Sequence, residues 1–170
     1  MAQTTFDGPV RSLGGMYSQG PNNMVTAGAT LTLDPALHGG RIILIPATCA
    51  ITLPATVTTA YPASSGPGAD PNSANNLGVA YRLFFNVISA GATAQTVTCG
   101  GSDKYVGELI VSGTTTMGFA SVTGTIITLN ATTTGGAARG SFITLIPLAA
   151  NLMSVQGVLI GSGTVATPFS

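Results

Sequence analysis

The stretch SFITLIPLAANLMSVQGVLI, residues 141–160, holds two runs of apolar residues separated by a short interruption. Side chains on a β-strand alternate between its two faces. In the first run this alternation places Phe142 and Ile146 on one face and Ile143 and Leu145 on the other. Neither run has the 3.6-residue spacing of an amphipathic helix. The stretch therefore predicts two β-strands that carry apolar residues on both faces.

The same two-faced pattern is present in two further places. In residues 153–160 one face would carry Met153, Val155 and Leu159 and the other Val158 and Ile160. In residues 81–88 one face would carry Tyr81, Leu83, Phe85 and Val87 and the other Phe84 and Ile88. A two-layered sheet structure needs only one apolar face per strand. The second apolar face is expected to be covered either by the chain's own loops or by another subunit.

Strand-like runs recur from residue 30 to the end of the 170-residue chain, about ten in all, separated by Gly, Asn, Ser, Thr and Pro. This pattern predicts an all-β fold, an antiparallel β-sandwich of jelly-roll kind, over residues 30–170. Residues 54–79 hold four prolines and many small polar residues, so they are expected to form a long loop.

Residues 1–29 lack a strand pattern and are expected to form an extended N-terminal arm. The arm is too apolar for a solvated tail, so it should dock either on the chain's own domain or on a neighbour. Its apolar residues include Phe6, Val10, Leu13, Met16, Tyr17 and Met24.

Charged residues make up only 6% of the chain, against about 25% in ordinary soluble domains, and their formal charges cancel. Such a surface does not repel a second copy, which favours self-assembly. The five basic residues are scattered, so no nucleic-acid partner is expected. Pro147 and the polar residues Asn151, Ser154 and Gln156 interrupt the most apolar stretch, so no membrane-spanning helix is expected. The first ten residues lack a signal-peptide pattern, which favours synthesis in a cytoplasm.

Titratable groups are too few and too scattered to predict catalysis or a cofactor. The only histidine, His38, precedes two glycines, but a G-x-S-x-G nucleophile motif is absent, and a lone histidine is more often a hydrogen-bonded structural residue than a metal ligand. Asp103 and Glu108 could form the pair of catalytic carboxylates of a glycosidase. Asp103-Lys104 is better interpreted as a turn with an exposed ion pair. We predict no catalytic, cofactor-binding or metal-binding residues.

The two cysteines, Cys49 and Cys99, lie fifty residues apart and form no CxxC motif. They could be a disulfide, two buried thiols or reactive groups. Buried free thiols are favoured, because nothing in the sequence indicates export and a cytoplasm is reducing.

Several strings resemble virion proteins of tailed bacteriophages. The opening Phe6-Asp7-Gly8-Pro9-Val10-Arg11-Ser12-Leu13-Gly14-Gly15 resembles the start of phage head decoration proteins. Gly101 to Gly107, Thr128 to Gly136 and the terminal Gly163-Thr164-Val165-Ala166-Thr167-Pro168-Phe169-Ser170 resemble the rest of that pattern. The chain departs from the pattern at Ser141 and around Met153.

The resemblance implies a capsid decoration, or cement, protein that binds the outside of a phage head as a homotrimer at three-fold and quasi-three-fold positions. The partner would be the major capsid protein, contacted by Phe6, Pro9, Val10, Arg11 and Leu13. Contacts between subunits would involve Phe84, Ile88, Val158, Ile160 and Phe169. The alternative is a head-fibre, tail-fibre or baseplate component that binds a receptor or carbohydrate.

Overall fold

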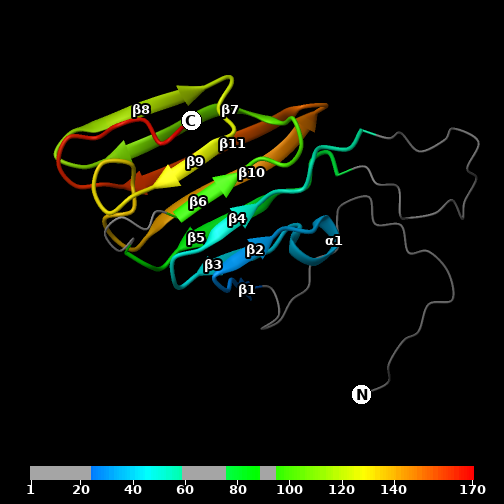
Figure 1. Ribbon diagram of the computed structural model, residues 1–170, viewed down its shortest axis with the longest axis horizontal. Coiled ribbons are helices and arrows are strands. Elements are labelled where there is room, and N and C mark those ends of the chain that lie inside the picture. The colour runs from blue at the N-terminus through cyan, green and yellow to red at the C-terminus, as the bar shows by residue number, and fades with distance from the viewer. Residues whose placement is uncertain (1–23, 59–75, 89–94) are drawn as a thin grey trace, which may run out of the picture.

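The computed structural model describes residues 24–58, 76–88 and 95–170, which form two β-sheets and one short helix (Figure 1). The all-β prediction is confirmed. In chain order the elements are β1 (Met24–Thr26), β2 (Thr30–Thr32), α1 (Pro35–His38), β3 (Ile42–Ile45), β4 (Ala50–Thr52), β5 (Tyr81–Phe85), β6 (Gln95–Thr98), β7 (Lys104–Ser112), β8 (Thr116–Ser121), β9 (Ile126–Leu129), β10 (Ser141–Ala149) and β11 (Leu152–Ile160).

The larger sheet has seven strands in the order β1-β3-β5-β10-β11-β7-β8, and the smaller has four in the order β2-β4-β6-β9. The first six strands alternate between the two sheets. Within each sheet they pair in parallel, β1 with β3 and β3 with β5, and β2 with β4 and β4 with β6. The chain therefore passes through both sheets three times before it reaches β7, as Figure 1 shows.

The predicted antiparallel pairing is wrong for these four pairs and for β7 with β11. It is right for β5 with β10, β10 with β11, β7 with β8 and β6 with β9. A short connection of small residues can form a hairpin turn between antiparallel strands. Residues 27–29 instead lead from one sheet to the other, with Ala27 N–H donating to Leu44 O in one sheet and Ala29 O accepting from Ala50 N–H in the other. The jelly-roll connectivity is not confirmed.

The predicted boundary of the N-terminal arm at residue 29 is too late, because Met24–Thr26 already pairs with β3. Residues 1–23 lie outside the described residues, as does most of the predicted loop 54–79. The described ends of that loop are tied together by Asn76. Its Oδ1 accepts from Val57 N–H at 2.9 Å, and its Nδ2 donates to Ala55 O at 2.9 Å.

The core lies between the inner faces of the two sheets and consists of alternate residues of each strand. The two-faced pattern is confirmed in β5, where Tyr81, Leu83 and Phe85 are buried while Arg82 and Phe84 are exposed. It is confirmed in β10 and β11 as well. Their buried members are Ile143, Leu145, Met153, Val155 and Leu159. The opposite face of the seven-stranded sheet therefore carries the second apolar set.

Candidate interaction face on the seven-stranded sheet

The side of the seven-stranded sheet that points away from the four-stranded sheet is called the outer face here. Strand register places four apolar residues side by side across it, one on each of four neighbouring strands. Phe84, Phe142 and Ile110 are 41%, 44% and 41% exposed, and Val158 is partly buried. We call Phe84, Phe142, Val158 and Ile110 the apolar row.

A second row runs beside it, two residues along the same four strands, and is polar. It consists of Arg82 on β5, Thr144 on β10, Gln156 on β11 and Glu108 on β7. Arg82 and Glu108 stand at its two ends with two strands between them, about 14 Å apart. The polar row thus has one positive and one negative end.

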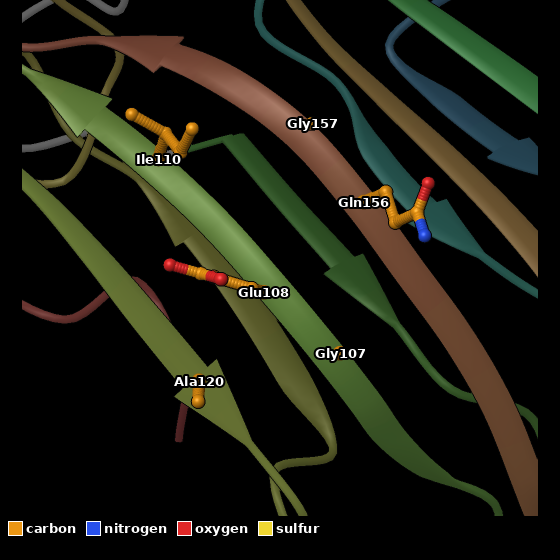
Figure 2. Close-up of a pocket in the computed structure, with 6 residues that line it drawn as sticks. All are labelled: Gly107, Glu108, Ile110, Ala120, Gln156 and Gly157. Carbon is orange, nitrogen blue, oxygen red and sulfur yellow. The ribbon is translucent and has the colours of Figure 1, made fainter.

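Two hollows flank the centre of the outer face. The larger, of about 470 Å³, is lined by Gly107, Glu108, Ile110, Ala120, Gln156 and Gly157 (Figure 2). The smaller, of about 290 Å³, is lined by Ile42, Arg82, Leu83, Phe84, Phe142, Ile143 and Thr144. Each charged end of the polar row therefore borders one hollow.

Only small side chains stand beside Glu108 on β8, where Ala120 pairs with it and Gly118 lies two residues away. Figure 2 shows the Glu108 side chain extending toward β8, where Ala120 is the labelled neighbour. Its Oε1 occupies the place that a Cβ on Gly118 would take. The carboxylate therefore lies beside Gly118 of β8.

Two of the predicted subunit-contact residues, Phe84 and Val158, belong to the apolar row. Ile160 lies two residues beyond Val158 on the same strand and is partly buried. Ile88 follows the end of β5 and is 54% exposed. The prediction did not name Phe142 and Ile110 as contacts. The alternation of side chains along each strand could have placed Phe142 and Ile110 on the outer face. Only the register between neighbouring strands shows that they lie in one row with Phe84 and Val158.

Phe169, also predicted as a subunit contact, packs inside its own subunit. Its ring lies 6.2 Å from that of Tyr105, and its backbone forms a bridge with Ile127 of β9. It is therefore remote from the apolar row. The predicted capsid-contact residues Phe6, Pro9, Val10, Arg11 and Leu13 all lie outside the described residues.

Asp103 and Glu108 are not brought together, because Asp103 is buried just before β7 begins while Glu108 is exposed in the middle of that strand. Asp103 is only 2% exposed, so the interpretation of Asp103-Lys104 as an exposed turn is wrong for the aspartate. Its carboxylate accepts hydrogen bonds at 2.7 Å from both the backbone N–H and the hydroxyl of Thr56. This carboxylate therefore holds the start of the long loop against the end of the sandwich.

His38 is a structural residue at the end of α1, as the sequence predicted. Its Nδ1 accepts from the backbone N–H of Asp34 at 2.8 Å. The Asp34 carboxylate in turn accepts from the N–H of Leu37 at 3.1 Å, which satisfies a free donor at the helix start. The pair closes a short turn and leaves His38 mostly buried.

Cys49 and Cys99 are buried free thiols, as predicted. Since Ala50 pairs with Thr96, Cys49 lies beside Gln95, four residues or about 13 Å from Cys99 along the neighbouring strand. A disulfide requires Cα atoms within about 7 Å. Burial raises the pKa of the Cys99 thiol to about 11 and also raises the pKa of Cys49.

Both thiols are therefore expected to resist a disulfide-exchange reagent at pH 8 while the protein is folded and to react fully in denaturant, because the thiolate is the reactive form. The free energy of unfolding should fall as the pH rises from 9, the ordinary pKa of a thiol, to about 11. Over this range the Cys99 thiol loses its proton in the unfolded chain but keeps it in the folded protein, which favours the unfolded chain. Rapid reaction of either thiol in the native protein would contradict this burial.

Within the part of the chain that the structure describes, no three His, Cys, Asp or Glu side chains gather as a metal site would require. In those same residues no helix has the length and apolarity to cross a membrane. Comparisons with protein-family models, with curated proteins and with solved structures find no match.

Proposed function

We propose that this chain is a structural virion protein of the capsid decoration type. It docks as a homotrimer on the major capsid protein at the surface of a phage head and catalyses no reaction. The observation that carries the proposal is the outer face of the seven-stranded sheet. An apolar row with two phenylalanines more than 40% exposed, beside a polar row with one charge of each sign, has the character of a protein-docking surface.

The composition supports the same function. Only 6% of the residues are charged and the formal net charge is zero, so like-charge repulsion between copies is small. The resemblance of the Phe6 to Gly15 segment and of the terminal Gly163 to Ser170 segment to phage decoration proteins supplies the identity of the partner. We retain the homotrimer that this resemblance implies, but not the fully antiparallel pairing of strands.

Decoration of this kind would stabilise a shell by adding buried area at many equivalent seams. Each square ångström of apolar surface removed from water contributes about 25 cal/mol. A trimer offers three sets of contacts in fixed geometry, so weak single contacts are strengthened by a high effective concentration. In this proposal the arm residues Phe6, Pro9, Val10, Arg11 and Leu13 lie along capsid subunits, while the outer faces meet between copies.

The test is immunogold electron microscopy of the phage particles produced by cells that carry this gene, with antibodies raised against the purified chain. Gold is expected to be distributed over the whole head surface. Gold confined to the tail, the baseplate or thin fibres would instead support the fibre alternative. Particles without label, from a culture in which the chain is expressed, would refute a virion role.

A further inference from the structure

The outer face carries its two charges at opposite ends of the polar row, and this placement has the form expected of a surface that meets a copy of itself. Arg82 is on β5 and Glu108 is on β7, and the order β5-β10-β11-β7 places them symmetrically about the seam between β10 and β11. A rotation that exchanges the two ends would bring opposite charges together.

We propose that a second copy of this chain docks on the outer face, with Arg82 of each copy paired to Glu108 of its neighbour. This inference rests on the proposed function in that it assumes association of identical copies. It adds the surface, the register and the pair of charges by which the copies recognise each other.

The register follows from the direction of the symmetry axis. A rotation axis parallel to the strands keeps every residue at its own height along them, so each row meets the same row of the neighbour. Around a three-fold axis the β8 edge of one sheet comes beside the β1 edge of the next, so β7 of one copy lies on the same side of the contact as β5 of the next. A two-fold axis above the seam between β10 and β11 places β7 of one copy directly opposite β5 of the other. In both arrangements Arg82 therefore approaches Glu108 of the neighbouring copy.

The apolar row is complementary to itself under the two-fold rotation. When the two ends exchange, Phe84 comes opposite Ile110 and Phe142 comes opposite Val158. Each contact then matches a large aromatic side chain with a smaller aliphatic one, which allows side chains to interdigitate. If the two phenylalanines stood at the centre of the row, the same rotation would place phenylalanine against phenylalanine.

The larger hollow provides a receptor for the arginine. It has a volume of about 470 Å³, and Glu108 and Gln156 are among the residues that line it. A guanidinium group carries its donors in a planar fork that matches a carboxylate, and a neighbouring amide oxygen can accept a further hydrogen bond. The docked neighbour would cover this hollow, which would partly shield the ion pair from water and salt.

The area is sufficient for a stable contact. Neighbouring strands lie about 4.8 Å apart, so the seven strands of the sheet span about 30 Å. The three nine-residue strands β7, β10 and β11 run for a similar length, and the other four strands are shorter. A standard protein interface buries about 800 Å² on each partner. The outer face can supply that area without help from the four-stranded sheet.

The experiment is a charge exchange read by multi-angle light scattering over a range of concentrations. Arg82→Glu and Glu108→Arg each place like charges against one another and are expected to raise the dissociation constant at least tenfold. The double variant restores opposite charges and is expected to recover the wild-type mass. Arg139→Glu is the matched control, because Arg139 is exposed in the turn before β10 and belongs to neither row. Circular dichroism checks that each variant is folded.

The outcomes separate this inference from the proposed function. A wild-type trimer that keeps its mass in both folded single variants, or that the double variant does not restore, overturns the inference and leaves the decoration proposal standing. A wild-type dimer that the single variants dissociate and the double variant restores supports the inference and overturns the trimer. A wild-type monomer at all concentrations overturns both.

Discussion

Replacing Gly107 with alanine is expected to lower the melting temperature by about 10 °C. Gly107 has φ 142°, a conformation that side chains with a Cβ rarely adopt, and a Cβ there would meet the carbonyl oxygen of Val155 on β11. Backbone strain costs about 1–3 kcal/mol and the steric conflict with fixed backbone a similar amount. Each kcal/mol lowers the melting temperature of a domain of this size by about 2–4 °C.

Two other glycines provide graded controls for that experiment. Gly163 has φ 71° with open space around its Cβ position, so Gly163→Ala isolates the strain from the contact. Gly28 has neither a positive φ nor a near contact, so Gly28→Ala is expected to change the melting temperature little. Differential scanning calorimetry should rank the loss as Gly107 above Gly163 above Gly28. An equal melting temperature for Gly107→Ala and Gly28→Ala would contradict the close parallel pairing of β7 and β11.

Truncating Tyr105 to alanine is expected to cost about 3–5 kcal/mol of unfolding free energy. Tyr105 is 0% exposed, and its hydroxyl donates to the carbonyl oxygen of Val97 at 2.9 Å. Tyr105 belongs to the seven-stranded sheet and Val97 to the four-stranded sheet, so this side chain joins the two layers. Burial raises the pKa of the phenol well above its ordinary value, which keeps the hydroxyl a donor.

The matched variant is Tyr105→Phe, which keeps the ring and removes only the hydroxyl. It is expected to cost about 1 kcal/mol, because one buried hydrogen bond is lost while the packing against Phe169 remains. Urea unfolding at fixed protein concentration measures both values. A cost below about 1 kcal/mol for Tyr105→Ala would show that the two sheets are not joined at this position.

Secondary structure and the two-faced strands could be predicted because both depend on residues close in the sequence. The alternation in residues 81–88 shows directly that Phe84 and Tyr81 lie on opposite faces, and the structure confirms it. The parallel windings could not be predicted in the same way. A small-residue connection such as 27–29 is compatible both with a hairpin and with a passage to the opposite sheet, and only distant packing decides between them.

One sequence signal for these windings was present and missed. The segments Thr30-Leu31-Thr32-Leu33, Ala50-Ile51-Thr52-Leu53 and Thr96-Val97-Thr98-Cys99 have the same pattern of apolar and polar residues. In the structure they stack in register, since Leu31 pairs with Ile51 and Ile51 with Val97. Their unequal spacing along the chain hides the repeat, because the long loop separates the second copy from the third.

The candidate interaction face was predicted only in part, for a related reason. Local alternation identified Phe84 and Val158 as members of a second apolar face. The polar row joins Arg82 to Glu108 through Thr144 and Gln156, four residues that become neighbours only when β10 and β11 insert between β5 and β7. No spacing in the sequence indicates this insertion.

The central claim is that copies of this chain associate through a shared surface, and the most direct measurement is the mass of the purified protein by light scattering at several concentrations. The account predicts a mass of three chains that does not change with dilution. Because one chain has a mass of 16.8 kDa, a mass that stays at that value at every concentration would contradict the account.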